Sequence, residues 1–135
     1  MPSFLLEIVT PDRQFYNGQA ESLILPIQDG FYGVETGHEP VVTSVEPGEL
    51  RYRVDGQWRV AAVTSGFAEI MPDRVILLVS AAESPEEIDL KRAEAARARA
   101  EDRLRQKESL REYHSSKAAL ARAMARLKAV RDSRR

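Results

Sequence analysis

Cysteine is absent from this 135-residue chain, which excludes disulfide bonds, thiol nucleophiles and cysteine-ligated metals. No apolar run approaches the roughly 20 residues of a membrane-spanning helix, so the sequence predicts none. Glycine is missing after Gly66, proline is missing after Pro85, and Tyr113 is the only aromatic residue beyond that proline. The chain therefore changes its physical character near residue 84, and its two parts are expected to differ in structure.

Lysine is missing from the first part, and the two parts carry opposite net charges. Residues 1–84 contain 5 Arg and 12 Asp or Glu, a net charge of −7. Residues 85–135 contain 15 basic and 9 acidic residues, a net charge of +6. Such opposition indicates different partners or contact between the two parts, although helices rich in Ala, Arg and Glu also have this composition when their faces are simply solvated.

The sequence also lacks the usual catalytic sets. His38 and His114 are the only histidines, and neither belongs to a metal-ligand spacing. Ser65-Gly66 is not part of a nucleophile elbow, and no phosphate-binding G-x-x-x-x-G-K-[ST] motif is present. We therefore expect no catalytic residues, no metal site and no enzyme activity.

Residues 1–84 have the pattern of an all-β unit. Short apolar runs alternate with turn signals, as in residues 4–10, 21–27 and 41–45. Asp55-Gly56 separates two further runs and is typical of a two-residue type I′ hairpin. Residues 75–79 are apolar at every position and predict a central strand buried on both faces. This part is expected to form an antiparallel β-sandwich or flattened barrel.

Residues 85–135 have the pattern of two helices. Ser84, Pro85 and Glu87 form a helix-start signal with a capping box, and the first helix is expected over residues 85–106. The second helix is expected over residues 112–130. Either a hairpin or one long interrupted helix fits this pattern. The fold class is therefore α+β, with a β domain at 1–84 and a helical domain at 85–135.

The apolar stripes of these helices are narrow and rich in alanine. The expected stripe is Ala93, Ala96, Ala100 and Leu104 on the first helix, and Tyr113, Leu120, Met124 and Leu127, flanked by Ala119 and Ala123, on the second. Each buried methylene contributes only about 0.8 kcal/mol, so a hairpin held by alanine should be marginal. We expect a helical arm that can open from a rigid β platform.

The loop at residues 30–40 contains three glycines and two large aromatic residues, Phe31 and Tyr32. It could be a simple hairpin and corner, or it could be a docking loop for another protein, because exposed aromatic residues anchor interfaces. His38 in this loop is expected to be a loop or packing residue.

Arginines recur at helical spacing in the second part. Arg92, Arg99 and Arg103 share one face of the first helix, with Asp89 one turn before Arg92, and Arg122 and Arg126 are one turn apart on the second. If these faces meet in a hairpin, the arginines could bind an anion, since guanidinium groups suit phosphate. The alternative is a set of solvated faces with local ion pairs.

These residues resemble the epsilon subunit of the bacterial F-type ATP synthase over essentially the whole chain. The matching pieces, in order, are Val9-Thr10-Pro11-Asp12, Gly30-Phe31-Tyr32-Gly33-Val34, Gly37-His38-Glu39-Pro40, Pro47-Gly48, Ser65-Gly66-Phe67-Ala68-Glu69-Ile70, Ala82-Glu83 and Ile88-Asp89-Leu90-Lys91-Arg92-Ala93. The resemblance implies a β-sandwich followed by an antiparallel two-helix hairpin.

The resemblance also implies the partners and the location. The protein would be a noncatalytic subunit of the central stalk, joining the gamma subunit to the c-ring and coupling proton flow to rotation. Its helical arm would extend towards the alpha/beta catalytic head and inhibit ATP hydrolysis. It would lie at the cytoplasmic face of the bacterial plasma membrane, peripheral and reaching the membrane only through the complex. Phe31, Tyr32, Gly33 and His38 would belong to the rotor docking loop.

Some members of this family bind ATP through an Ile/Leu-Asp-x-x-Arg-Ala motif, which is intact here at residues 88–93. The implied ATP-binding residues are Glu83, Ile88, Asp89, Arg92, Ala93, Arg99, Arg122 and Arg126. ATP would be a regulatory ligand that stabilises the folded arm, and no cofactor would be required.

Two other functions are compatible with the sequence. One is a stand-alone ATP sensor, which would need Asp89 and Arg92 even without partners. The other is a nucleic-acid-binding adaptor that uses the basic helices. Acidic residues are interleaved with the basic ones, and no set of aromatic residues accompanies them for base stacking, so we expect no nucleic-acid partner.

Overall fold

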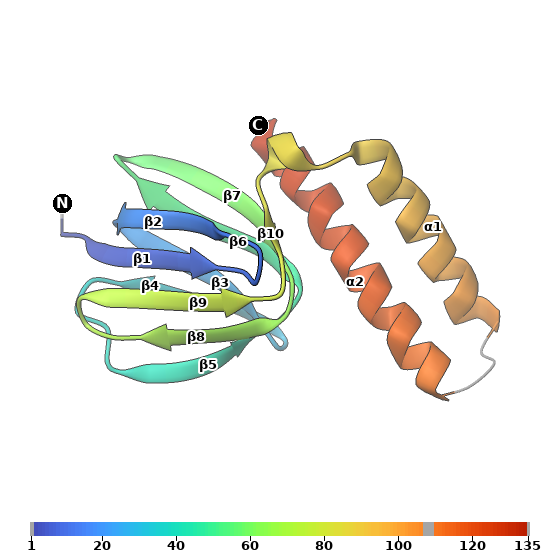
Figure 1. The fold of residues 1–135 in the computed structure, drawn as a ribbon, viewed down its shortest axis with the longest axis horizontal. Coiled ribbons are helices and arrows are strands. Elements are labelled where there is room, and N and C mark those ends of the chain that lie inside the picture. The colour runs from blue at the N-terminus through green and yellow to red at the C-terminus, as the bar shows by residue number, and fades with distance from the viewer. Residues whose placement is uncertain (1, 107–109, 135) are drawn as a thin grey trace.

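The computed structural model describes residues 2–106 and 110–134 and confirms a β-sandwich followed by two helices (Figure 1). Within these residues, sheet A contains β1 (Phe4–Val9), β2 (Gln14–Ala20), β5 (Val41–Val45), β8 (Gly66–Ile70) and β9 (Arg74–Val79), in the order β2-β1-β9-β8-β5. Sheet B contains β3 (Ser22–Ile27), β4 (Gly30–Glu35), β6 (Gly48–Val54), β7 (Gln57–Val63) and β10 (Ala82–Glu83), in the order β10-β7-β6-β3-β4.

Most neighbouring strands pair antiparallel, as the short turns of the sequence predict. The exception is the pair of β1 and β9, which is parallel with Leu6 opposite Val75. The Asp55-Gly56 turn between β6 and β7 has positive φ at both residues, 51° and 77°, which is the geometry of the predicted type I′ hairpin. Local turn chemistry therefore fixes the register of this hairpin.

The core lies between the two sheets. Its largest fully buried side chains come from alternate positions of the strands, and they are Phe4, Leu6, Ile8, Leu23, Leu25, Leu50, Ile70, Leu77, Val34, Val45, Val63 and Val75. The opposite positions of the same strands face outwards, as the pleat of a strand requires. Among the described residues, no helix is both long and apolar enough to cross a bilayer.

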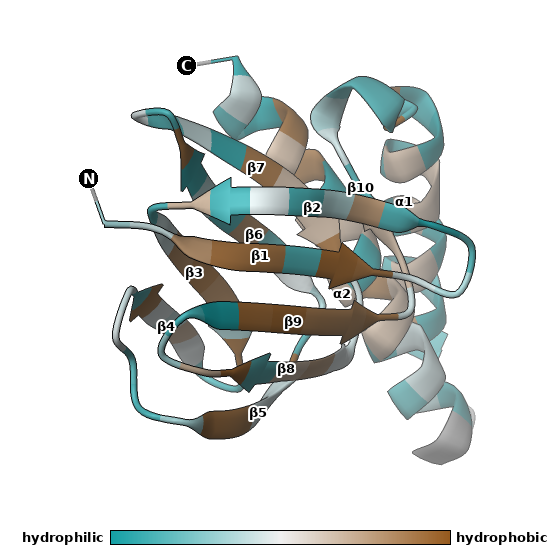
Figure 2. Ribbon diagram, turned by 60° about the vertical axis from the view of Figure 1, so that its left-hand side comes forward, coloured by the Kyte–Doolittle hydropathy of each residue, from teal (hydrophilic) through white to brown (hydrophobic). Residues whose placement is uncertain are grey.

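The prediction that residues 75–79 are buried on both faces is wrong. Strand β9 is central in sheet A, and Val75, Leu77 and Val79 point into the core. Leu78 points outwards and is 55% exposed. In Figure 2, β9 is coloured hydrophobic along most of its length although one of its faces is not covered. The continuous apolar pattern therefore marks an uncovered apolar surface, not a second core.

The helical part begins one turn later than predicted. Ser84 and Glu87 form the expected capping box, but it opens a short 3-10 helix, η1 (Pro85–Glu87). Ile88 is then extended, with φ −87° and ψ 125°. Helix α1 (Leu90–Gln106) follows, and helix α2 (Leu110–Ser133) completes the chain. The break at residues 88 and 89 separates the platform from the arm.

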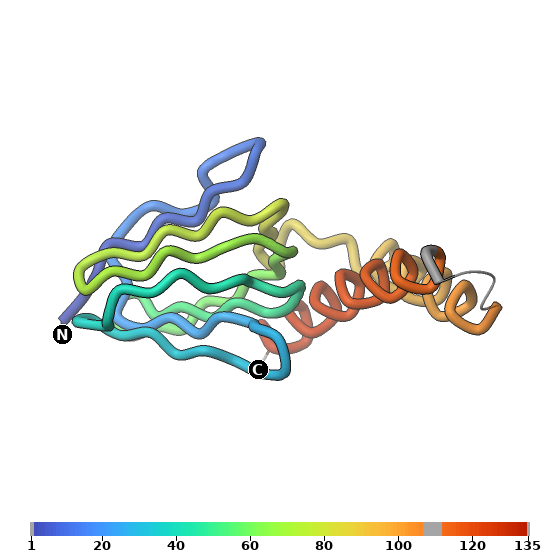
Figure 3. The backbone as a smooth tube through the Cα atoms, turned by 90° about the horizontal axis from the view of Figure 1, so that it is seen from below, coloured from blue at the N-terminus to red at the C-terminus, as the bar shows by residue number. Residues whose placement is uncertain are grey.

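The two helices form a hairpin, and α2 lies between α1 and the sandwich (Figure 1). Helix α2 packs on β6 and β7 of sheet B. Figure 3 shows that the hairpin extends well beyond one end of the sandwich. Part of α2 is therefore held by the platform, and the rest is held only by α1.

The stripe predicted for the second helix is partly wrong. Tyr113 is 38% exposed and Met124 is 44% exposed. Over residues 112–133 of α2 the buried residues are smaller: Ser116, Ala123, Ala125, Ala129 and Val130. Helix α2 has to pack against α1 on one side and sheet B on the other, and small side chains allow both approaches. On α1 the predicted Ala93 and Ala100 are buried.

Candidate functional site

The junction between platform and arm is held by Glu87. Its carboxylate accepts a hydrogen bond from the backbone N–H of Ser84 at 2.9 Å and pairs with Arg13 of the β1–β2 loop at 2.8 Å. Arg13 also donates to the carbonyl oxygen of Ala82 at 3.0 Å. The hydrogen bond from Arg13, with those from Ser84, lowers the pKa of Glu87 to about 2. A residue far away in sequence therefore fixes the start of the arm.

The Ile/Leu-Asp-x-x-Arg-Ala motif has four fixed positions, here Ile88, Asp89, Arg92 and Ala93, and three of them have clear structural roles. Ile88 packs against the cluster of Ala62, Ala125 and Ala129, where α2 meets β7. The Asp89 carboxylate accepts a hydrogen bond from the backbone N–H of Arg92 at 3.1 Å and so caps α1. Ala93 is buried where α1 lies against α2. The side chain of Arg92 is exposed, and Arg92 is the fixed position of the motif that packing does not explain.

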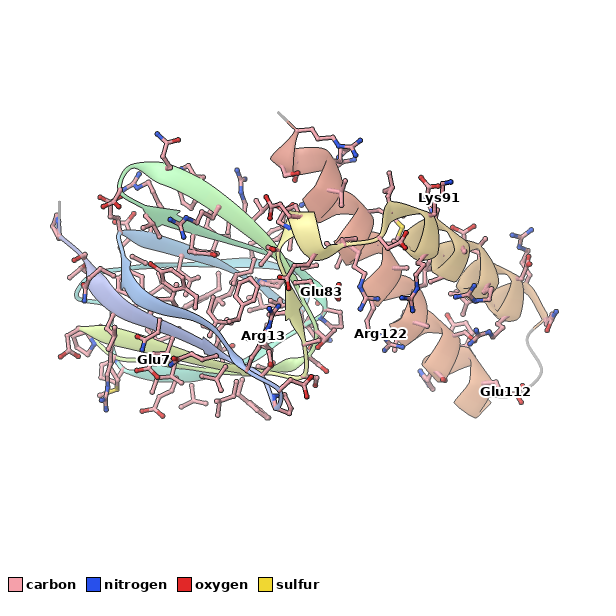
Figure 4. All side chains as sticks on the ribbon, turned by 45° about the horizontal axis from the view of Figure 1, so that its top comes forward. Glu7, Arg13, Glu83, Lys91, Glu112 and Arg122 are labelled. Carbon is pink, nitrogen blue, oxygen red and sulfur yellow. The ribbon has the colours of Figure 1, made fainter. Side chains whose placement is uncertain are left out.

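The remaining arginines predicted for the ATP site have different surroundings. Arg126 is paired with Glu83 of β10, through Nη2 at 2.7 Å and Nε at 2.8 Å. Arg99 and Arg122 are exposed, and within the described residues the guanidinium groups of Arg92, Arg99 and Arg122 have no hydrogen-bond or ion-pair partner. Figure 4 shows Arg13, Glu83 and Arg122 in the region between the sandwich and the helices. The structure thus joins Glu83 to Arg126 and leaves three cations available.

A groove runs between α2 and the end of the sandwich beside Arg122 and Arg126. Its volume of about 590 Å³ falls within the range of small-molecule sites. His114 and Lys117 of α2 line it together with these arginines, and the hydroxyl-bearing residues Thr64, Ser65 and Ser80 line the opposite side. The carboxylate of Glu46 also lines this groove, so Lys117, Arg122 and Arg126 are the charged groups in it that suit an anion.

The predicted docking loop divides into packed and exposed residues. Nδ1 of His38 lies 2.7 Å from the carbonyl oxygen of Glu39 and therefore donates to it, so Nε2 accepts the hydroxyl hydrogen bond of Tyr32 at 2.9 Å. Phe31 is 57% exposed, and the Nζ of Lys128 on α2 lies 5.0 Å from the centre of its ring. Gly33 is exposed with open space around its Cα. Phe31 and Gly33 can contact a partner, whereas Tyr32 and His38 hold the loop.

The sequence reasoning missed an apolar surface on the outer face of sheet A. Phe67 of β8 lies directly opposite Leu78 of β9, and Val42 of β5 is diagonal to Phe67. These three side chains are 62%, 55% and 69% exposed, respectively. We call them the outer apolar patch. A strand with one buried face normally has polar residues on its other face. The apolar residues at every position of 75–79 were therefore the sequence signal for this patch. Contiguous exposed apolar residues mark interaction sites.

Comparison with known proteins gives matches over the whole chain. Residues 3–85 match the family "ATP synthase, Delta/Epsilon chain, beta-sandwich domain", and residues 86–131 match "ATP synthase, Delta/Epsilon chain, long alpha-helix domain". The ATP synthase epsilon chain of Ruminiclostridium cellulolyticum is 54% identical over 96% of this chain and 97% of the relative. That of Caldanaerobacter subterraneus is 47% identical over 93% and 92%.

Two solved structures have the same fold. A chain of the Euglena gracilis mitochondrial ATP synthase, in a structure of OSCP, F1 and c-ring, matches with a TM-score of 0.82 and 20% identity, over 100% of this chain and 83% of that one. A chain of the Tetrahymena thermophila mitochondrial ATP synthase central stalk and c-ring matches with a TM-score of 0.63 and 14% identity, over 94% and 96%.

Proposed function

The chain belongs to the delta/epsilon family of ATP synthase subunits, and we propose that it is a noncatalytic epsilon subunit of the central stalk. In this role it couples rotation between the c-ring and the gamma subunit. The outer apolar patch of Val42, Phe67 and Leu78 carries this proposal. The patch lies on a rigid sheet and faces away from the core, which suits a permanent rotor contact. The gamma subunit is its proposed partner, and the loop with exposed Phe31 is the proposed contact with the c-ring.

The gamma contact is testable with one substitution. Burying a phenylalanine side chain contributes about 1.5–3 kcal/mol, so Phe67→Ser should weaken binding of purified gamma subunit about tenfold to a hundredfold. Trp58→Ser is the matched control, because Trp58 is also an exposed aromatic residue, 43% accessible, but lies on β7 of sheet B. Calorimetry or a surface-binding assay measures both. Equal affinities of the parent and Phe67→Ser would place the gamma contact elsewhere.

The helical hairpin is proposed to regulate ATP hydrolysis by leaving the sandwich and reaching the alpha/beta catalytic head. The small size of the residues at the contact supports this. The cluster that joins α2 to sheet B consists of Ala62, Ala125 and Ala129, with Ile88 beside it. A contact built from alanine buries little apolar area, so modest changes in conditions can displace it. The basic arm would then meet acidic segments of the head.

ATP is proposed as the ligand that stabilises the folded arm. The exposed guanidinium groups of Arg92 and Arg122, with Arg126 at the platform contact, support an anion site. The chain lacks a phosphate-binding loop motif, so the nucleotide would be sensed and not hydrolysed. A ligand at 100 times its dissociation constant stabilises the state it binds by about 2.7 kcal/mol.

Titration of the full chain with ATP tests this role. Arg92→Ala and Arg126→Ala should abolish or strongly weaken binding. Arg97→Ala is the matched control, because Arg97 also lies on α1 but pairs with Glu101 at 2.8 Å. If millimolar ATP does not bind the parent, the nucleotide role is wrong and the coupling role is unaffected.

The proposed location is the cytoplasmic face of the bacterial plasma membrane, reached through the partner subunits.

A further inference from the structure

Glu49 is a carboxyl group buried beneath the arm. It lies on the outward side of β6, opposite Ala62 of β7, at the place where α2 packs on sheet B. Its side chain is only 1% exposed. Burying a carboxylate is costly unless hydrogen bonds or close cations compensate for the lost water. This position therefore requires an explanation beyond packing.

The groups around Glu49 do not compensate an ionised carboxylate well. Oε1 lies 3.9 Å from Nζ of Lys128 and 3.9 Å from Nε of Arg51, both beyond hydrogen-bond length. Among the described residues, no N–H or O–H group donates to either oxygen of Glu49. The carboxyl group of Asp132 on α2 is the side chain placed to share a hydrogen bond with Glu49. Two carboxyl groups can form a hydrogen bond only when one of them is protonated.

The wider surroundings are mixed in charge. Arg131 of α2 contacts Asp132, with 3.4 Å between Nε and Oδ1. The groove beside Glu49 is lined by further charged residues, namely Glu94, Arg97 and Glu101 of α1 and Arg134, which follows α2. Lys128 is shared, because it also lies over the ring of Phe31. No single cation is therefore committed to Glu49.

The direction of the pKa shifts agrees with a shared proton. Burial, together with the hydrogen bond to Asp132, raises the pKa of Glu49 to about 7. The same hydrogen bond lowers the pKa of Asp132, whose side chain is 16% exposed. The proton therefore lies mainly on Glu49, the more deeply buried of the two groups.

We propose that seating helix α2 on β6 binds one proton, shared between Glu49 and Asp132, so that rising pH favours release of the arm. The effect of pH on the position of the arm rests on the arm movement proposed above. The proton shared by Glu49 and Asp132 is a property of the closed state alone. The closed arm would thus respond to the proton concentration around the complex, independently of any nucleotide.

The sign of the effect follows from proton linkage. In the closed state Glu49 holds its proton more tightly than it does when water reaches it in the open state. Closure is therefore favoured at low pH. The equilibrium constant for closure falls by up to about tenfold for each pH unit between the ordinary pKa of 4.5 and about 7, and then levels off. Glu87 acts in a lower range, because its pKa is lowered instead of raised.

Two measurements on the full chain test the proposal. Carbon-13 NMR of the side-chain carboxyl groups gives the pKa of Glu49 directly. Because the chain lacks cysteine, Ser65→Cys and Ser115→Cys can carry a fluorophore pair that reports the distance between platform and α2. The titration runs from pH 5 to 8 on the parent, Glu49→Gln and the control Glu94→Gln, an exposed carboxyl group of α1.

We expect the parent and Glu94→Gln to lose the short distance progressively as pH rises towards 7, with no further loss above it, and Glu49→Gln to show no such pH dependence. Asp132→Asn should also flatten the response, and it serves as a second variant if Glu49→Gln folds poorly. An ordinary pKa for Glu49 would overturn the proposal, as would an unchanged pH response in Glu49→Gln. A raised pKa with a constant distance would support the shared proton and contradict the proposed arm movement.

Discussion

Gly66 is the residue on which the geometry of the outer apolar patch depends. It begins β8, pairs with Val79 of β9 and immediately precedes Phe67. A Cβ atom at Gly66 would overlap the backbone carbonyl oxygen of Leu78 and would lie 2.7 Å from the Cα of Val79. These are backbone atoms of the central strand of sheet A, so no side chain can rotate to make room. Gly66→Ala must therefore push β8 and β9 apart.

The expected cost of Gly66→Ala is about 3 kcal/mol of unfolding free energy or more, at the upper end of the range for overpacked sites. For a chain of this size that loss lowers the melting temperature by roughly 10 °C. Because the distorted strands carry Phe67 and Leu78, affinity for the gamma subunit should fall as well. Urea denaturation measures the stability, and circular dichroism measures the melting temperature.

Gly33→Ala is the matched control for this substitution. Gly33 is also a strand glycine, in β4, but the position of its Cβ has no atom within 4 Å. This change should alter the stability by less than about 1 kcal/mol. A small effect of Gly66→Ala, or equal effects of the two substitutions, would refute the argument that close backbone approach determines the cost.

Three further predictions concern the arm. The ionised Glu87 stabilises the parent at neutral pH, and this contribution is lost as pH falls from 4.5 towards 2, so Glu87→Gln should lack it at every pH. Because the side chain is 39% exposed, solvent screening reduces the contribution to about 1 kcal/mol of unfolding free energy. Urea denaturation at pH 7 and pH 3 measures it. Ala100→Leu should overpack the contact between the helices. Hydrogen exchange should then rise in both helices while the sandwich stays protected. Ala95→Leu, at an exposed position of the same helix, should not raise hydrogen exchange. A double-mutant cycle of Glu83→Gln and Arg126→Gln should give a coupling of about 1 kcal/mol, and no coupling would show that this ion pair does not hold the arm.

Features set by local sequence were predictable. The strands of the sandwich follow from alternation, and the Asp55-Gly56 hairpin follows from turn chemistry. The ion pair of Arg13 with Glu87 was not predictable, because its partners are 74 residues apart and the capping box that includes Glu87 gives no information about Arg13. Sequence periodicity also carries no information on what covers an apolar face.

That gap explains the errors at β9 and α2. Leu78 was assigned to a core because an apolar residue in an apolar run has the same pattern whether a second layer or a partner protein covers it. Met124 was assigned to the helix contact because it is apolar and lies at helical spacing from Leu120 and Leu127, whereas a helix packed on two sides selects small residues such as Ala123 and Ala125. In both cases the tertiary arrangement determines whether the apolar residue is buried, and hydrophobicity alone does not predict it.

The Ile88–Ala93 segment shows how far a motif can be interpreted. Ile88, Asp89 and Ala93 would be needed in any protein that packs a helical arm on this platform, because they fill the alanine cluster, cap α1 and line the helix contact. Their presence therefore does not distinguish a nucleotide-binding arm from one that merely folds back. The side chain of Arg92 has no such role, since it is exposed and, among the described residues, its guanidinium group is unpaired. Arg92→Gln should therefore leave the thermal stability of the ligand-free chain unchanged and remove its stabilisation by ATP. If Arg92→Gln instead destabilises the ligand-free chain, the motif is structural throughout.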